Sequence, residues 1–94
     1  MLITSRLIIS FIRNNTSAGN GAFYGMDVNG VGNWSLGIPD NTDAFTIVDG
    51  EGNSGTERFR ISSTGLVGIG TVNPDHNLHV YQEAGDAVVT IESQ

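Results

Sequence analysis

Two histidines near the C-terminal end of the chain are the first residues to weigh as metal ligands or catalytic bases. His76 and His79 lie three positions apart, a spacing that places two side chains on one face of a helix but not of a strand. Because turn residues surround His76, we interpret it as an exposed turn residue and His79 as an outward strand residue. Their remaining use is a modest response to pH, since imidazole titrates near neutrality.

The segment "DGEGNSGTE", residues 49–57, has oxygen-bearing side chains at alternate positions, as calcium-binding loops do. Asp49, Glu51 and Asn53 supply this alternation. The sixth position of the loop is Ser54 and the twelfth is Arg60, where such loops use glycine and glutamate. We therefore interpret the segment as a solvated hairpin loop and expect no metal site in it.

The remaining polar residues do not have the spacing of a catalytic or cofactor site. Carboxylates are paired at two places, Asp40 with Asp43 and Asp49 with Glu51. A glycosidase needs such a pair across a cleft, for which so short a chain has little room. The glycines of "GLVGIG", residues 65–70, run in the reverse order of the dinucleotide-binding fingerprint. We expect neither enzymatic activity nor a bound cofactor.

Two aromatic residues could stack on a sugar ring, because exposed rings are common in glycan sites. Tyr24 and Trp34 lie beside segments rich in glycine and asparagine. Trp34 also shares a strand face with Leu36 and Ile38, which favours packing in a core. Both residues stay candidates for glycan contact, with core packing the preferred interpretation for Trp34.

The composition limits the kinds of partner. The chain of 94 residues has a net charge of −6 and contains no cysteine, so nucleic acid and anionic membranes are poor partners and disulfides are excluded. The N-terminal apolar run is too short to span a membrane, and we expect no insertion into one. A chain of this length buries a modest share of its surface when folded alone. Association with other copies of the chain is the source of additional stability that remains.

The pattern of the whole chain predicts an all-β fold. Thirteen glycines and many Asn, Ser and Thr residues form turn clusters between short apolar runs, and no window shows helical periodicity. Eight strands are expected, at residues 7–12, 22–28, 34–38, 45–48, 58–62, 66–69, 78–81 and 87–91. We treat residues 1–94 as one β-rich unit with three parts: N-terminal strands over 1–33, a tryptophan-containing hairpin region over 34–56, and a glycine-rich repeat with a C-terminal strand over 57–94.

Alternation within these runs indicates which side chains are buried. Phe59 and Ile61 point to one face of their strand, and Arg58 and Arg60 to the other. The run "LIISFI", residues 7–12, is apolar on both faces, so it requires cover on both sides. In a chain of this size that cover can come from a neighbouring copy.

Residues 57–80, "ERFRISSTGLVGIGTVNPDHNLHV", resemble a repeat of bacteriophage tail fibres and tailspikes that lies upstream of the intramolecular chaperone of endosialidase type. The pattern is an arginine-flanked strand, a Ser/Thr-Gly turn, Val-Gly-Ile-Gly-Thr, a proline-containing turn and Leu-His-Val. Residues 34–50 resemble the segment that commonly precedes it. The resemblance is specific for fibre proteins and says little about a biochemical activity.

The resemblance implies a homotrimeric fibre segment, β-prism- or β-helix-like, in a virion or at another extracellular location, where it supports attachment to the host cell. Gly65, Gly68 and Gly70 would permit close approach of backbones near a three-fold axis. We expect the residues that bury apolar surface between chains to be Leu7, Ile9, Phe11, Phe45, Ile47, Phe59, Ile61, Val67, Ile69, Leu78, Val80 and Ile91.

Two alternatives remain open beside the trimeric fibre segment. In the first, the chain is the subunit of a self-assembling filament, in which residues 1–12 complete the sheet of the next copy by β-strand addition. In the second, the chain is a receptor-binding tip that contacts a cell-surface glycan through Tyr24 and Trp34. Either alternative is compatible with the same turn-rich composition.

Overall fold

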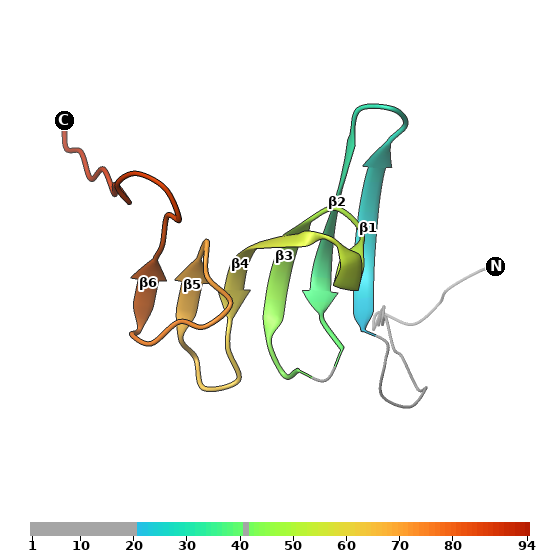
Figure 1. Cartoon of the computed structure of the whole chain (residues 1–94), viewed down its shortest axis with the longest axis horizontal. Coiled ribbons are helices and arrows are strands. Elements are labelled where there is room, and N and C mark those ends of the chain that lie inside the picture. The colour runs from blue at the N-terminus through green and yellow to red at the C-terminus, as the bar shows by residue number, and fades with distance from the viewer. Residues whose placement is uncertain (1–20, 41) are drawn as a thin grey trace, which may run out of the picture.

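The computed structural model describes residues 21–40 and 42–94, and in this part of the chain the fold is all-β (Figure 1). The only helical element among these residues is a single 3-10 turn, η1, at Gly52–Ser54. No helix of the described residues is long and apolar enough to span a membrane. The strands are β1 (Ala22–Val28), β2 (Gly32–Ile38), β3 (Phe45–Asp49), β4 (Thr56–Ile61), β5 (Val67–Ile69) and β6 (Leu78–Val80).

The six strands form one open sheet in which every strand pairs with its neighbours in the chain, in the order β1-β2-β3-β4-β5-β6. The pairs from β1 to β5 are antiparallel, and connections of three to six residues join them. In the turn between β4 and β5, the Gly65 N–H donates to the Ser62 carbonyl at 2.9 Å with Gly65 at φ +87°. Glycine adopts this left-handed conformation without steric cost. The last pair, β5 with β6, is parallel and needs the longer connection over 70–77.

The register places apolar side chains together on one side of the sheet. Residues directly opposite each other in paired strands point to the same face, and one such row crosses all six strands, through Tyr24, Leu36, Ile47, Phe59, Ile69 and Val80. The residues of this row and their neighbours at alternate positions define what we call the apolar face: Tyr24, Met26, Val28, Trp34, Leu36, Ile38, Phe45, Ile47, Phe59, Ile61, Val67, Ile69, Leu78 and Val80.

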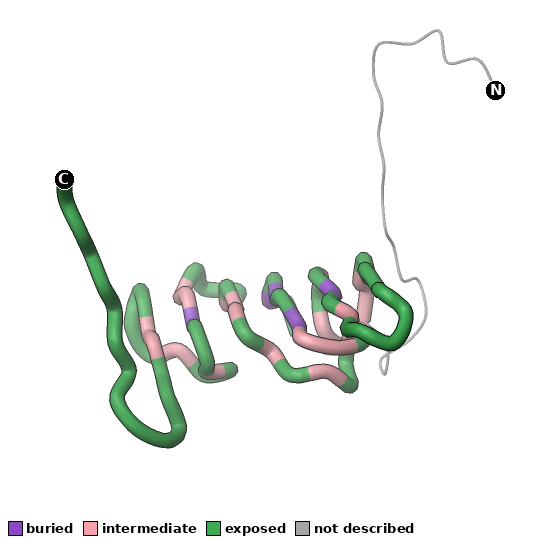
Figure 2. Tube along the Cα trace, turned by 90° about the horizontal axis from the view of Figure 1, so that it is seen from above, coloured by how far each residue is buried: buried purple, intermediate pink, exposed green. Residues whose placement is uncertain are grey.

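The opposite side, which we call the covered face, is closed by two connections of the chain, at 50–55 and 70–77. Both lie on the same side of the row of strands in Figure 2. The Ser35 hydroxyl is buried and fixes the first, because it donates to the Gly50 carbonyl at 2.8 Å and accepts from the Gly52 N–H at 3.2 Å. Gly68 lies under the second, where an added Cβ would stand 2.7 Å from the Thr71 carbonyl oxygen. The first connection thus closes over β2, where Ser35 and Gly50 are 15 positions apart in the sequence, and the second closes over β5, the strand directly before it.

A β-bulge changes the alternation expected for β4. The register with β3 shifts between Ile47 and Val48, so that Glu57 pairs with Val48 and Arg58 has no partner opposite it. The extra residue moves Glu57 to the same face as Arg60. The sequence did not predict this bulge, whereas the expected alternation of Phe59 and Ile61 with Arg60 is kept in the pairing with β5.

Six of the eight predicted strands are confirmed within one or two residues of their ends. The strand expected over 7–12 lies outside the described residues. The strand expected over 87–91 is not formed in the single chain, where residues 81–94 are exposed and have no regular secondary structure. A strand needs a partner for its backbone hydrogen bonds, and none of the described strands pairs with this segment.

Replacing Ser35 with alanine tests the anchoring of the 50–55 connection. We expect Ser35→Ala to lower the free energy of unfolding by about 1–3 kcal/mol, because the Gly52 N–H and Gly50 carbonyl lose their buried partner. The measurement is urea denaturation at fixed protein concentration. Ser63→Ala is the matched control, since Ser63 is exposed in a turn, and it should change the stability by less than about 0.5 kcal/mol. Equal effects of the two variants would contradict this account.

Candidate assembly surface

The apolar face is open in the single chain. Most of its side chains are more than one third exposed, with Ile69 at 42% and Leu78 at 59%. Among the described residues, by contrast, only two apolar side chains are buried, those of Ala44 and Val48. Monomeric proteins seldom leave a contiguous apolar surface of this extent open. The sheet therefore carries most of its apolar area on the outside.

The structure brings together the described residues that the sequence predicted for the assembly core, with one exception. Eight of them lie on the apolar face: Phe45, Ile47, Phe59, Ile61, Val67, Ile69, Leu78 and Val80. Ile91 is the exception, since it lies in the C-terminal segment and is 91% exposed. Leu7, Ile9 and Phe11 lie outside the described residues. Burial between chains stays a prediction for the whole set.

The apolar face also extends further than the sequence indicated, over β1. Met26 pairs with Trp34, and Val28 pairs with Gly32 at the end of the hairpin. The signal that could have found them is the alternation of Tyr24, Met26 and Val28 in "AFYGMDV". Tyr24 and Trp34, the candidates for glycan contact, lie on this face within β1 and β2, which the turn at 29–31 joins.

The glycines that were expected to permit close approach between chains each have a structural role within the single chain. Gly65 and Gly70 have positive φ angles, at +87° and +80°. Gly68 is buried on the covered face, beneath the 70–77 connection. Gly68 therefore points away from the apolar face, and its role between chains stays a prediction.

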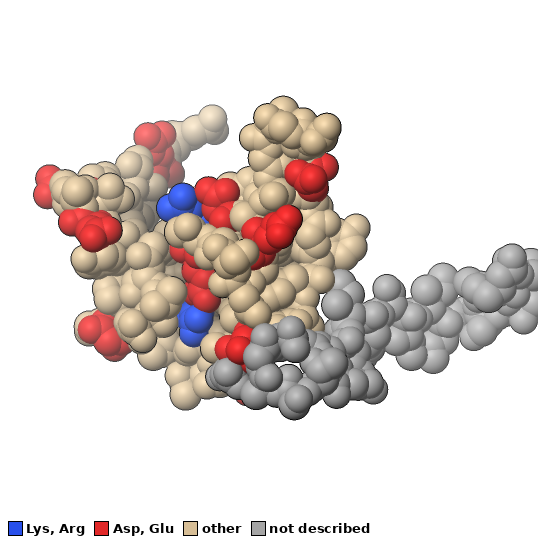
Figure 3. All heavy atoms as spheres, turned by 45° about the vertical axis from the view of Figure 1, so that its right-hand side comes forward, with Lys and Arg blue, Asp and Glu red and all other residues tan. Residues whose placement is uncertain are grey.

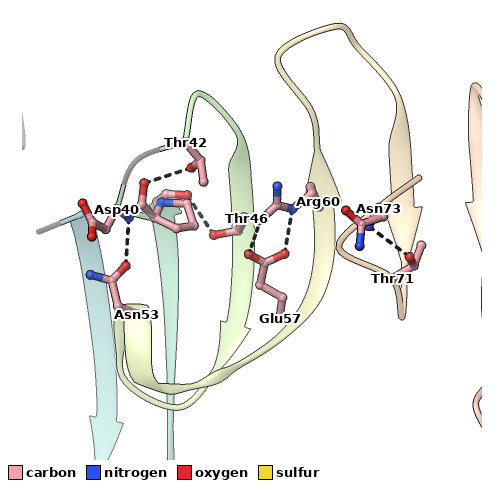
Figure 4. Close-up of polar contacts among 10 residues, drawn as sticks. Asp40, Thr42, Thr46, Asn53, Glu57, Arg60, Thr71 and Asn73 are labelled. Carbon is pink, nitrogen blue, oxygen red and sulfur yellow. Dashed lines mark hydrogen bonds and ion pairs between the residues drawn. The ribbon is translucent and has the colours of Figure 1, made fainter. Parts of the chain in front are cut away.

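Charged groups pair on the sheet and at its margin. The Arg60 guanidinium donates to both carboxylate oxygens of Glu57, at 2.6 and 2.8 Å (Figure 4), and this hydrogen bonding raises the pKa of Arg60. Arg58 contacts Asp49 at 3.1 Å in an exposed position. Figure 3 shows the two arginines of the described residues among acidic side chains. Paired in this way, the arginines stabilise strand positions and leave the surface predominantly acidic.

Asp40 and Asp49, one from each carboxylate pair noted in the sequence, have neighbours outside their own pair. Asp40 lies at a hollow of about 500 Å³ that Asn53 and Glu57 also line, and its backbone N–H donates to the Asn53 side-chain oxygen at 2.9 Å (Figure 4). Glu57 is held by Arg60, and Asp49 by Arg58. These contacts give the carboxylates a structural use. The described residues contain no group of three His, Asp or Glu side chains that could hold a metal ion.

The two histidines share one carboxylate, which the sequence did not indicate. His76 and His79 place their Nδ1 atoms 2.6 and 3.2 Å from Oδ1 of Asp75. The hydrogen bond from His76 lowers the pKa of Asp75. The His79 ring also meets the Tyr81 ring edge to face, with centroids 6.4 Å apart. As predicted, His76 is exposed, whereas His79 is half-buried.

Comparison with known families and curated proteins found no relative of this chain. No protein-family model matches the chain, and no curated protein matches it. The function must therefore be argued from the apolar face and from the sequence pattern of residues 57–80.

The contact of Asp75 with the two histidines predicts how pH affects the stability of the 70–77 connection. Because its pKa is lowered in the fold, Asp75 stabilises the connection at pH values above the pKa of an unfolded aspartate, and this contribution is lost as the pH falls through the folded value. We expect His76→Ala to raise the pKa of Asp75, measured by NMR titration of its carboxyl carbon, and His79→Ala to raise it less. An unchanged midpoint in His76→Ala would show that the hydrogen bond does not form.

Proposed function

We propose that this chain is a structural segment of an extracellular fibre, built as a homotrimer of the kind found in phage tail fibres and tailspikes, and that it supports attachment to a host cell. The observation that carries the proposal is the open apolar face, which spans all six strands while the described residues bury only two apolar side chains of their own. A surface of this kind calls for a partner, and further copies of the chain supply a complementary one.

Three copies arranged about an axis parallel to the cross-strand rows would close this surface. The row from Tyr24 to Val80 runs perpendicular to the strands, so three apolar faces turned inward form a continuous core along the axis. Successive strands then follow one another along that axis at about 4.8 Å each. This gives an elongated, repetitive body, as a fibre segment requires.

The sequence pattern of residues 57–80 supports the same proposal. Its arginine-flanked strand, glycine turn and Val-Gly-Ile correspond to β4, the turn at Gly65, and β5. The proline-containing turn and Leu-His-Val correspond to the 70–77 connection and β6. The pattern that resembles phage fibres is thus the part of the sheet in which the antiparallel order changes to parallel.

A self-assembling filament remains the second candidate. The observation in its favour is that β1 and β6 each pair with one strand only among the described residues, and unpaired strand edges accept strands from other chains. The donor proposed for this filament, residues 1–12, lies outside the described residues. The glycan-binding alternative conflicts with the trimer, because Tyr24 and Trp34 cannot be buried between chains and bind a sugar at once.

A pair of matched substitutions tests whether the apolar face holds the chains together. Ile69 on the apolar face and Val72 on the 70–77 connection are similarly exposed in the single chain, at 42% and 48%. We expect Ile69→Asp to abolish the oligomer, because three carboxylates would be buried near the axis. Val72→Asp should leave it intact. Sedimentation velocity measures both.

The control also separates the possible failures. If both variants assemble like the original chain, the apolar face is not the interface and the proposed function is wrong. If both variants dissociate, a charge on either side of the sheet is sufficient to break the oligomer. The assignment of the interface to the apolar face is then wrong. Circular dichroism checks that each variant keeps its β structure.

A further inference from the structure

The C-terminal segment has the composition of a strand but pairs with none of the six described strands of its own chain. Residues 87–91 read Ala-Val-Val-Thr-Ile, a run rich in β-branched side chains. Val88, Val89 and Ile91 are 75%, 61% and 91% exposed. In an extended conformation, Ala87, Val89 and Ile91 would share one face. The segment thus offers a short apolar edge that its own chain leaves uncovered.

The open edge of β6 has the backbone groups that such a segment needs. The Asn77 carbonyl and the Tyr81 N–H bond to β5, and in a parallel ladder alternate residues face the same neighbour. The N–H and carbonyl groups of Leu78 and Val80 therefore point away from β5. No described strand pairs with them. Their side chains lie on the apolar face, so an added strand would extend that face.

The path of the segment directs it away from the β6 edge of its own chain. Residues 86–88 line a hollow of about 470 Å³ together with Arg58, Ile69 and Val80. Ile69 and Val80 belong to the apolar face, and Arg58 belongs to β4. After β6 the chain bends and then runs outward to the C-terminus on the β6 side of the sheet, without pairing with any described strand (Figure 1). It does not run alongside the open edge.

We propose that residues 87–91 of one copy add as an antiparallel strand to the open edge of β6 in a neighbouring copy. Val89 then lies opposite Val80 and Ile91 opposite Leu78, which continues two rows of the apolar face. Thr90 faces the same side as His79. Around a three-fold axis each copy donates one segment and receives one, so the exchange closes on itself. This inference rests on the proposed homo-oligomer and deepens it by naming the residues that link the copies.

Disulfide trapping tests the exchange cleanly, because the chain contains no cysteine. One chain carries Val80→Cys, and a second chain with an affinity tag carries Val89→Cys. The two are unfolded together, refolded and oxidised, so a tagged–untagged disulfide can form only between chains. The control replaces Val89→Cys by Val88→Cys, whose side chain would point to the other face. We expect the Val80–Val89 pair to crosslink at least about tenfold more than the control, since a disulfide requires Cα atoms within about 7 Å.

A second pair, Leu78→Cys with Ile91→Cys, checks the antiparallel register in the same assay. Comparable yields for Val80 with Val89 and with Val88, or no crosslink with either, would overturn the inference. An untagged chain that carries both Val80→Cys and Val89→Cys tests the competing hairpin, in which the segment folds back on its own β6. A disulfide within that chain, without one between chains, also overturns the inference.

The solution mass separates this inference from the proposed function. We expect Val89→Asp to weaken association by about tenfold or more, the loss expected for one buried valine side chain, and Val88→Asp to leave it unchanged. If the original chain is an oligomer and both variants associate as tightly, the exchange is wrong while the proposed fibre segment stands. If the original chain is a monomer at every concentration, both are wrong.

Discussion

Burial of the apolar face is the interaction on which the rest of this structure depends. The described part of the chain covers one side of the sheet only, and it buries just Ala44 and Val48 as apolar side chains. A fully buried aliphatic or aromatic side chain contributes about 1.5–3 kcal/mol relative to an exposed one. Most of that stabilisation is still to be gained when the chain is alone, so association and folding are coupled in our account.

The contacts on the covered face hold the sheet together, and they leave the apolar face free for contact between chains. Ser35 ties the 50–55 connection to β2, and the buried Thr46 hydroxyl donates to the Gly37 carbonyl of the neighbouring strand. The bulge at Arg58 lets Glu57 and Arg60 pair on the same side. These polar contacts hold the strands in register without using apolar surface. The apolar side chains therefore remain available as continuous rows for contact between chains.

Local pattern predicted the strands and much of the apolar face, since alternation and turn residues depend only on neighbours in the sequence. Trp34, Leu36 and Ile38 share a face as expected. The bulge at Arg58 depends on pairing with β3, and the shared contact of His76 and His79 with Asp75 depends on how the 70–77 connection folds. The prediction of a C-terminal strand failed for a similar reason: "AVVTI" has the propensity, but a strand also requires a partner, and the described strands of the same chain do not provide one.

The central claim, that copies of the chain bury the apolar face, is tested most directly by the solution mass of the unmodified protein. Multi-angle light scattering across a dilution series measures this mass without assumptions about shape. We expect a constant mass of three chains of 9.9 kDa each down to the lowest concentration that can be measured. A folded monomer of 9.9 kDa at every concentration would contradict it, because the apolar face would then be stable in water.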